Sequence, residues 1–279
     1  MGYIDAHVHV WTDDYETYPF AAGHDPDDAK PRTFHAADIL GHANPCGVDR
    51  VVLVQMSYYG TDNRYMLKTM ADHPGVFGGI GVVDVKGAAP EREMRELASK
   101  GVYGFRVAPR DQPLPTWCDG DGYARMFEAG AEDRLAICPL VTPEGLPALA
   151  RRCEQFPDTP ILIDHLCLVG GRGPVQTDHV EALCDMARFE QVMVKVSAFY
   201  ALGDKTEPYH DLRDLIGRVV DAFGPQRLMW ASDAPYQVQP PFTYAASVGL
   251  IAEGLDSLSQ DDREQILGGT AREFFFRSS

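Results

Sequence analysis

Two histidines separated by a single residue stand near the start of the chain, in the segment Ile4-Asp-Ala-His7-Val-His9-Val-Trp11. Apolar residues alternate with the histidines, which predicts a β-strand whose period of two places both imidazoles on one face. Such a pair can bind one metal ion. Otherwise each ring nitrogen needs a hydrogen-bond partner, because unpaired buried polar groups are costly. His-x-His is a short pattern, so an ordinary strand with satisfied histidines stays open on this evidence alone.

The elements that would position these histidines alternate regularly between strand and helix. We expect strands over 4–11, 50–55, 76–85, 102–107, 135–141, 160–165, 192–197 and 227–233. We expect helices over 34–43, 62–73, 90–100, 121–133, 143–155, 177–190, 208–223, 242–254 and 259–276. Short apolar strands separated by helices indicate a parallel sheet buried on both faces, and eight such units predict an α/β fold of the (β/α)8 TIM-barrel type. No linker or composition shift divides the chain, so we expect one domain over residues 1–279.

The active site of such a barrel lies at the carboxyl ends of its strands. Polar side chains collect at or just after these ends: His7, His9, Gln55, Ser57, Tyr58, Tyr59, Arg106, Arg110, His165, Ser197, Tyr200, Asp233 and Tyr236. Strands far apart in the sequence each contribute one or two of these groups. The pattern therefore predicts a catalytic or binding site at the barrel mouth. His24 and His210 are weaker candidates for it.

The composition excludes several classes of partner. With 41 acidic and 25 basic residues the formal net charge is −16, which disfavours nucleic acid and gives no basic patch for a membrane surface. An anionic substrate would need locally placed arginines. No apolar run approaches the ~20 residues of a transmembrane helix. The six cysteines form no C-x-x-C pair, and the first strand leaves no room for a leader, so we expect a cytoplasmic protein with reduced thiols.

Five short segments, in order along the expected strands, carry a resemblance to a known family. They are Asp5-Ala-His7-Val-His9, Gly104-Phe-Arg106, Ile163-Asp-His165-Leu, Lys195-Val-Ser197 and Trp230-Ala-Ser-Asp233-Ala-Pro. Together they resemble the amidohydrolase superfamily, and within it the short amidohydrolase 2 branch of metal-dependent TIM-barrel hydrolases. That branch includes lactonases of sugar acids, 4-sulfomuconolactonase and 2-pyrone-4,6-dicarboxylate lactonase. The resemblance runs from about residue 3 to about residue 275.

The resemblance implies which residues form the site. The family's metal or substrate histidines fall on His7, His9 and His165, and its strand-eight carboxylate falls on Asp233. Arg106 stands where dinuclear members have a bridging lysine or glutamate, and the fifth strand offers no histidine, so two metals are not expected. Two imidazoles and a carboxylate suit one Zn2+ with an open position for water. The branch also contains a metal-independent lactonase, which leaves operation without metal open.

Hydrolysis is the reaction that this arrangement predicts. Asp233 would take a proton from water, while a metal ion or His165 would polarise the carbonyl of a small, acidic lactone. Arg106 would bind a carboxylate or a developing oxyanion. The expected substrate-binding residues are Gln55, Tyr58, Tyr59, Arg106, Arg110, Ser197, Tyr200 and Tyr236.

Two other classes of function compete with this hypothesis. One is a lyase, either a decarboxylase of the same superfamily or a Schiff-base enzyme that uses Lys195. The other is a barrel that binds a ligand without catalysis. The absence of a strand-five histidine favours hydrolysis over decarboxylation. The aromatic segment 12–31 could be a lid or a packed surface loop, and a homo-oligomer is possible.

Overall fold

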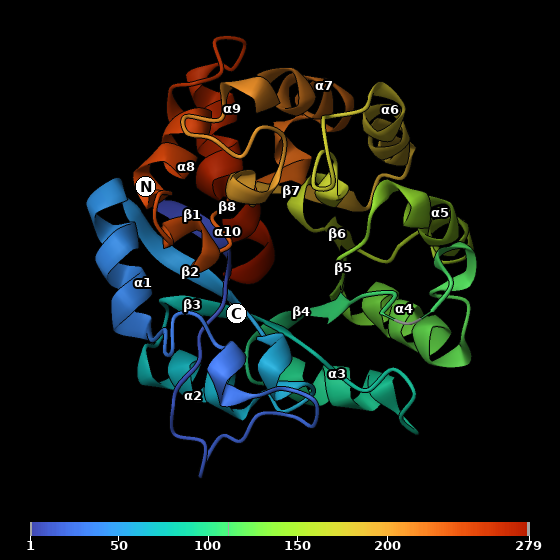
Figure 1. Cartoon of the computed structure of the whole chain (residues 1–279). Coiled ribbons are helices and arrows are strands. Elements are labelled where there is room, and N and C mark those ends of the chain that lie inside the picture. Colours follow the sequence, from blue (N-terminus) through green and yellow to red (C-terminus); the bar gives the residue numbers. More distant parts are fainter. Residues whose placement is uncertain (1, 111, 278–279) are drawn as a thin grey trace.

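The computed structural model describes residues 2–110 and 112–277 and contains one sheet of eight parallel strands (Figure 1). Each strand pairs with the next in sequence order, from β1 to β8. The strands are β1 Tyr3–Val8, β2 Val48–Val54, β3 Phe77–Gly81, β4 Val102–Val107, β5 Ala136–Pro139, β6 Ile161–Ile163, β7 Val192–Ser197 and β8 Leu228–Ala231. This order, with helices between the strands, confirms the predicted TIM barrel.

The last strand meets the first at the residues that matter most for the site. A parallel bridge joins Val8 to Ala234, and the backbone N–H of His9 donates to the carbonyl of Ala234 at 2.8 Å. The N–H of Asp233 donates to the carbonyl of His7 at 2.9 Å. Barrel closure therefore brings the His-x-His segment against the turn that follows β8.

Helices surround the strands (Figure 1). They are α1 Ala36–Ala43, α2 Arg64–Asp72, α3 Pro90–Ala98, α4 Asp121–Asp133, α5 Leu146–Gln155, α6 Thr177–Asp185, α7 Arg213–Phe223, α8 Tyr244–Ala252, α9 Gln260–Glu264 and α10 Thr270–Phe275. Their buried faces follow helical spacing: α7, for example, buries Leu215, Ile216, Val219 and Phe223. Within the described residues, no helix is long and apolar enough to span a membrane.

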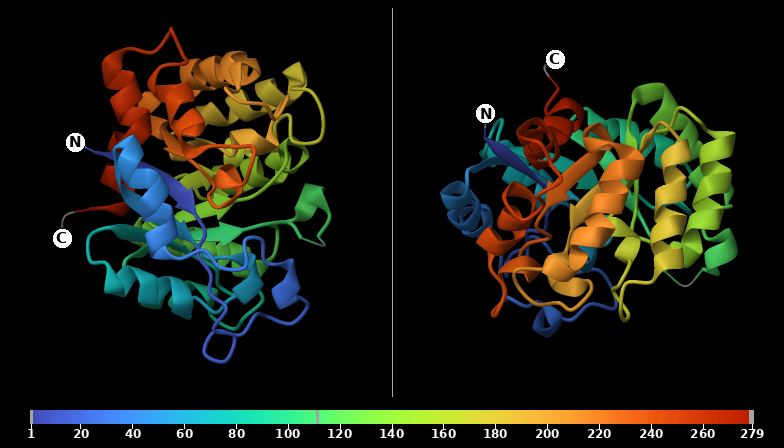
Figure 2. Two further views of the ribbon diagram at one scale, coloured as in Figure 1. Left: turned by 60° about the vertical axis from the view of Figure 1, so that its left-hand side comes forward. Right: turned by 90° about the horizontal axis from the view of Figure 1, so that it is seen from above.

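A small inner core fills the barrel below the site. Its members are Ile4, Ala6, Val52, Val54, Ile80, Ala136, Cys138, Leu162, Met229 and Ala231, all from strands. Phe274 and Phe275 of α10 pack beneath them and close the amino-terminal end of the barrel. Figure 2 shows both chain termini together at this end, opposite the 12–31 segment. The polar groups at the carboxyl ends of the strands therefore lie on a densely packed, rigid apolar core.

Several strands are shorter than predicted. β1 ends at Val8, β3 at Gly81, β6 at Ile163 and β8 at Ala231, so the polar residues that follow lie in turns. The predicted helix 259–276 is divided by a π-helical turn, Gln265–Gly269. This turn packs against the start of the first strand, where Gly268 lies close to the backbone of Gly2 and Ile4.

The 12–31 segment is a packed loop. Trp11 donates its indole N–H to the carbonyl of Pro31 at 2.9 Å, and the N–H of Ala21 donates to the carbonyl of Tyr58 at 2.7 Å. The N–H of Thr12 donates to the hydroxyl of Tyr59 at 3.0 Å. These bonds fix the segment at several points along its length. The structure therefore favours the surface-loop interpretation over a lid.

Candidate active site

The two histidines of the first segment face each other at the barrel mouth, as their spacing predicted. Their Nε2 atoms are 3.2 Å apart, and both side chains are buried. Simple alternation along β1 does not explain this geometry. Ile4 and Ala6 point into the barrel, so strict alternation would turn His7 away from it. A register shift between Asp5 and Val8 turns His7 inward.

Hydrogen bonds to the backbone set the orientation of His9. Its Nδ1 lies 2.8 Å from the carbonyl of Val54, an acceptor, so Nδ1 carries the proton. The Nε2 of His9 is then a lone pair that faces His7. Neighbouring groups thus direct this imidazole toward a metal ion or a substrate proton.

Asp233 completes the cluster. It follows β8 in a left-handed conformation, with φ of 65°, that turns its side chain toward the histidines. Its Oδ1 lies 3.5 Å from His7 Nε2 and 3.4 Å from His9 Nε2, and although it is buried it has no hydrogen-bond partner among the residues that the structure describes. Tyr200 donates its hydroxyl to Oδ2 at 2.6 Å. Burial alone would raise the pKa of Asp233, but the neighbouring imidazoles outweigh it and hold that pKa below its usual range.

The distances within this cluster fit a metal ion. Two ligands about 2.0 to 2.1 Å from a tetrahedral zinc ion are about 3.3 Å apart. The three edges of the triangle formed by His7 Nε2, His9 Nε2 and Asp233 Oδ1 measure 3.2, 3.5 and 3.4 Å. An unpartnered buried carboxylate oxygen beside two imidazole nitrogens is also what a cation would satisfy. The donor set therefore fits one divalent ion.

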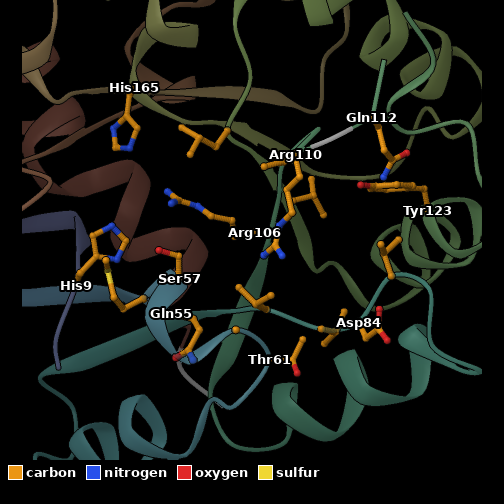
Figure 3. Close-up of a pocket in the computed structure, with 18 of the residues that line it drawn as sticks. His9, Gln55, Ser57, Thr61, Asp84, Arg106, Arg110, Gln112, Tyr123 and His165 are labelled. Carbon is orange, nitrogen blue, oxygen red and sulfur yellow. The ribbon is translucent and has the colours of Figure 1, made fainter. Parts of the chain in front are cut away.

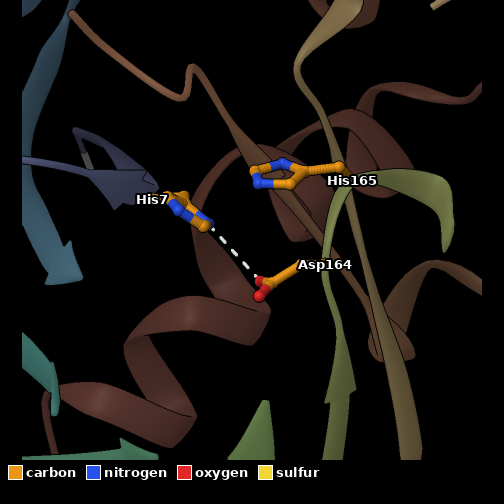
Figure 4. A group of neighbouring side chains, drawn as sticks. All are labelled: His7, Asp164 and His165. Carbon is orange, nitrogen blue, oxygen red and sulfur yellow. Dashed lines mark ion pairs between the residues drawn. The ribbon is translucent and has the colours of Figure 1, made fainter. Parts of the chain in front are cut away.

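A second buried aspartate holds His7 from the other side (Figure 4). Asp164 Oδ1 lies 3.4 Å from His7 Nδ1 and 3.0 Å from the ammonium of Lys195. Arg106 donates Nη2 to Asp164 Oδ2 at 2.9 Å. Burial opposes ionisation of Asp164, yet Lys195 and Arg106 outweigh it and hold its pKa well below the usual range. Asp164 and Lys195 are both fully buried, so each serves as the counterion of the other.

Both ring nitrogens of His7 have close polar neighbours. Burial and the charge of Lys195 lower the pKa of His7 well below its usual value, so the ring is neutral. His7 Nδ1 lies 3.1 Å from the Lys195 ammonium and 3.4 Å from Asp164 Oδ1, and in the tautomer with the proton on Nδ1, facing Asp164, the Nε2 lone pair points at His9 and Asp233. In this structure that lone pair accepts from Arg106 Nη2 at 2.9 Å, so a metal ion and Arg106 compete for it.

His165 begins a left-handed turn after β6. Residues His165, Leu166, Cys167 and Leu168 have φ values of 52, 50, 56 and 55°, an uncommon conformation for non-glycine residues. The His165 Nδ1 lies 2.9 Å from the hydroxyl of Ser197, and its Nε2 is 3.8 Å from Asp233 Oδ1. Burial lowers the pKa of His165, although the charges of Asp233 and Asp164 oppose this shift. Ser197 is thus the residue that orients His165.

A pocket of about 740 Å³ opens beside the cluster (Figure 3). Its lining includes His9, His165, Asp233 and, among the predicted substrate-binding residues, Gln55, Arg106, Arg110 and Tyr236. The Arg106 guanidinium extends toward His9 and His165 in Figure 3, and within the described part of the chain its buried Nε has no hydrogen-bond partner. Arginine donors therefore remain for a substrate next to the histidines.

The other predicted substrate-binding residues do not line this pocket. Ser197 and Tyr200 lie behind it and contact His165 and Asp233. The Tyr59 hydroxyl accepts from Thr12, and the Tyr58 hydroxyl donates to the carbonyl of Asp28 at 3.3 Å. Both tyrosines thus support the 12–31 loop. His24, which packs on Tyr58, and the exposed His210 are also absent from the lining.

Sequence reasoning did not assign several residues that the structure brings to the site. Asp164 lies in the Ile163-Asp-His165 motif, in which the sequence analysis assigned a role only to His165. The signal that could have identified Asp164 is its position directly after a buried strand. The far end of the pocket is lined by Asp84, Lys86, Gln112 and Tyr123. These four lie in loops and in α4, where no periodic pattern marks them.

Comparison with known proteins places the chain in a family. Residues 4–277 match the family model Amidohydro_2, described as amidohydrolase. The L-fucono-1,5-lactonase of Burkholderia ambifaria is 30% identical in an alignment of 285 positions that covers 98% of this chain and 94% of that protein.

Solved structures share the fold. A probable 2-pyrone-4,6-dicarboxylic acid hydrolase from Acinetobacter baumannii, with citric acid bound, has a TM-score of 0.82 and 21% identity over 99% of this chain and 100% of its own. An amidohydrolase from Burkholderia multivorans with bound zinc has a TM-score of 0.78 and 22% identity, with both chains fully covered. The match over nearly the whole sequence, together with the histidine and aspartate cluster at the barrel mouth, shows that this chain belongs to the amidohydrolase family of hydrolytic enzymes.

Proposed function

We propose that this protein is a lactonase that hydrolyses the ring ester of a small, carboxylate-bearing lactone, with Asp233 as general base. The observation that carries the proposal is the unpartnered Oδ1 of Asp233, buried beside two imidazoles at one end of the pocket. A carboxylate in this position can take the proton of a water molecule that attacks a carbonyl in the pocket. The lactonase relative of Burkholderia ambifaria supports the same reaction class.

His7, His9 and Asp233 would hold one divalent ion, which we propose to be Zn2+, with His165 in reach. When bound, such an ion acts as a Lewis acid on an ester carbonyl and favours ionisation of water. The chain supplies the orientation of these ligands: Val54 fixes His9, Asp164 faces His7 Nδ1, and Ser197 contacts His165. Operation without metal, with the histidines in direct contact with the lactone, is the alternative within this proposal.

The arginines of the pocket would bind the negative charges of the substrate. Arg106 has a free buried Nε and stands next to the histidines, where an oxyanion would develop. Arg110 is exposed and lines the pocket beyond it, so it suits a carboxylate of the bound lactone. The net charge of −16 makes these local cations necessary for an anionic substrate.

The Schiff-base alternative finds no support in the position of Lys195. The lysine is fully buried, pairs with Asp164 at 3.0 Å and does not line the pocket. A nucleophilic amine must reach the substrate, whereas the Lys195 ammonium is held in an ion pair with the buried Asp164. We therefore propose a structural role for Lys195 as the counterion of Asp164.

A pH-indicator screen of lactones, run beside metal analysis of the purified protein, tests the proposal. We expect turnover of carboxylated lactones, and at least about tenfold lower kcat/KM for their uncharged counterparts, because a charged hydrogen bond contributes about 1.5–3 kcal/mol. Arg110→Met should remove most of this preference and leave turnover of uncharged lactones unchanged. Absence of turnover across the lactone panel with metal-loaded protein would contradict the proposed reaction.

A further inference from the structure

The carboxylate of Asp5 is buried beneath the site and has no part in the proposed chemistry. Asp5 lies on β1, two residues before His7, and is fully buried on the side of the strand that faces α8. No cation pairs with it among the described residues. Its two oxygens instead accept hydrogen bonds from the backbone N–H groups of His7 and Ser232 and from the hydroxyls of Ser232 and Tyr244.

The first of these bonds stabilises an irregularity in β1. Asp5 pairs with Val51 and Val8 pairs with Leu53, so β1 advances three residues while β2 advances two. This is a β-bulge, which leaves one residue outside the regular ladder. The Oδ1 of Asp5 accepts the N–H of His7 at 3.1 Å, inside the bulge. Without the extra residue, strict alternation after Ile4 and Ala6 would turn His7 out of the barrel.

The other bonds reach the turn that carries Asp233. Ser232 donates its N–H to Asp5 Oδ1 at 2.9 Å, and its hydroxyl donates to Oδ2. The same hydroxyl oxygen accepts the N–H of Ala234 at 2.9 Å. Ser232 is thus hydrogen-bonded to Asp5 directly, and Ala234 is connected to it through the Ser232 hydroxyl. These bonds hold the backbone on both sides of Asp233, which has a left-handed conformation with φ of 65°.

We propose that Asp5 is a positioning residue: its carboxylate fixes both the bulge that turns His7 inward and the turn that aims Asp233 at the two histidines. One residue thereby sets the relative placement of groups from the first and last strands, 226 positions apart in the sequence between His7 and Asp233. The kinetic part of its test rests on the proposed lactonase activity. The structural part does not.

Three variants separate positioning from general stability. Asp5→Ala removes all four acceptor contacts, so kcat should fall about 100-fold with KM within about threefold, as expected for a misplacement of about 1 Å. Asp5→Asn keeps an oxygen for the two N–H groups, while its amide can donate to the two hydroxyls, so it should restore kcat to within about fivefold of the wild type. Tyr244→Phe loses only the contact from α8 and should keep kcat within about threefold.

Crystal structures of the wild type and Asp5→Ala give a readout without activity. We expect the contacts of 3.5 Å and 3.4 Å between Asp233 Oδ1 and the two imidazoles to be lost in the variant. Unchanged contacts, or a kcat within threefold of the wild type, would overturn the proposal. If Asp5→Ala does not fold, Ser232→Ala replaces it and should lower kcat about tenfold, and an unchanged kcat there is equally contrary. If the wild type hydrolyses no lactone, the proposed function fails while the two crystal structures still decide the role of Asp5.

Discussion

Two aspartates approach His7 from opposite sides, and their surroundings differ sharply. Asp164 follows β6 and lies 3.4 Å from His7 Nδ1, whereas Asp233 follows β8 and lies 3.5 Å from His7 Nε2. Both are buried and both have lowered pKa values. Asp164 faces two cations, Lys195 and Arg106, whereas Asp233 Oδ1 faces imidazoles and the pocket and, among the described residues, no lysine or arginine pairs with it. Counterions, more than residue type or strand position, therefore separate the carboxylate of Asp164 from the one that we propose to be the general base.

The difference has a chemical consequence. A proton on Asp164 would leave two buried cations without their counterion, so this carboxylate is a poor base. A proton on Asp233 disturbs no ion pair with lysine or arginine, and the group borders the space where a substrate would bind. The comparison predicts opposite phenotypes for the same substitution at the two positions.

Asp233→Asn should give the largest effect, a loss of turnover of about 10²- to 10⁴-fold, because it removes a positioned base. The variant should fold normally and bind product with little change. In the wild type, the acid limb of the pH–rate profile should lie below pH ~4, since the pKa of Asp233 is held below the ordinary ~3.9. That limb should be absent in the variant. Near wild-type turnover would sink the assignment and make His165 the next candidate base.

Asp164→Asn should act mainly on stability. Removal of one partner of a buried ion pair costs about 3–5 kcal/mol, because Lys195 is left charged and unpaired inside the protein. Lys195→Met in the same chain should recover part of this loss, which urea unfolding of the single and double variants can measure. We also propose that the chain is one domain, so each curve should show one cooperative transition. An unchanged free energy of unfolding in Asp164→Asn would contradict the proposal that Asp164 is a structural counterion, and with it the distinction between Asp164 and Asp233.

His7→Ala with His9→Ala tests the metal beside Asp233. The double variant should bind no zinc, and the wild type should gain about 3–4 kcal/mol of stability at zinc concentrations of 100 to 1,000 times Kd, a gain that the variant lacks. Arg106→Met is the matched control. It frees the His7 Nε2 lone pair from its present donor and should raise zinc affinity in calorimetric titration. Stoichiometric zinc in the double variant would contradict the proposed ligands.

The sequence was sufficient to predict the barrel and the gathering of His7, His9 and Asp233 at its mouth, because apolar strand patterns and strand-end position are local signals. It was insufficient for the environment of those groups. Nothing near Asp164 in the sequence shows that Lys195 and Arg106 will neutralise it, since these residues come from β7 and β4. Likewise, Tyr200 and Ser197 had the right location, but only packing shows that they contact Asp233 and His165 from behind the pocket.

Tyr200→Phe should have the smallest effect on turnover, and it tests what sets the basicity of Asp233. The Tyr200 hydroxyl donates to Asp233 Oδ2 at 2.6 Å, and burial beside that carboxylate raises the pKa of Tyr200, so it stays a donor at working pH. This bond stabilises the ionised carboxylate and directs Oδ1 toward the histidines. Its loss should raise the pKa of Asp233 and lower kcat about tenfold, in line with about 1.5 kcal/mol for a hydrogen bond to a charged group. The acid limb of the pH–rate profile should therefore move to higher pH, whereas in Asp233→Asn it should disappear.

Tyr236→Phe, which removes a hydroxyl that makes no bond to Asp233, is the control and should leave the acid limb in place. An unmoved acid limb in Tyr200→Phe would mean that the imidazoles alone set the basicity of Asp233.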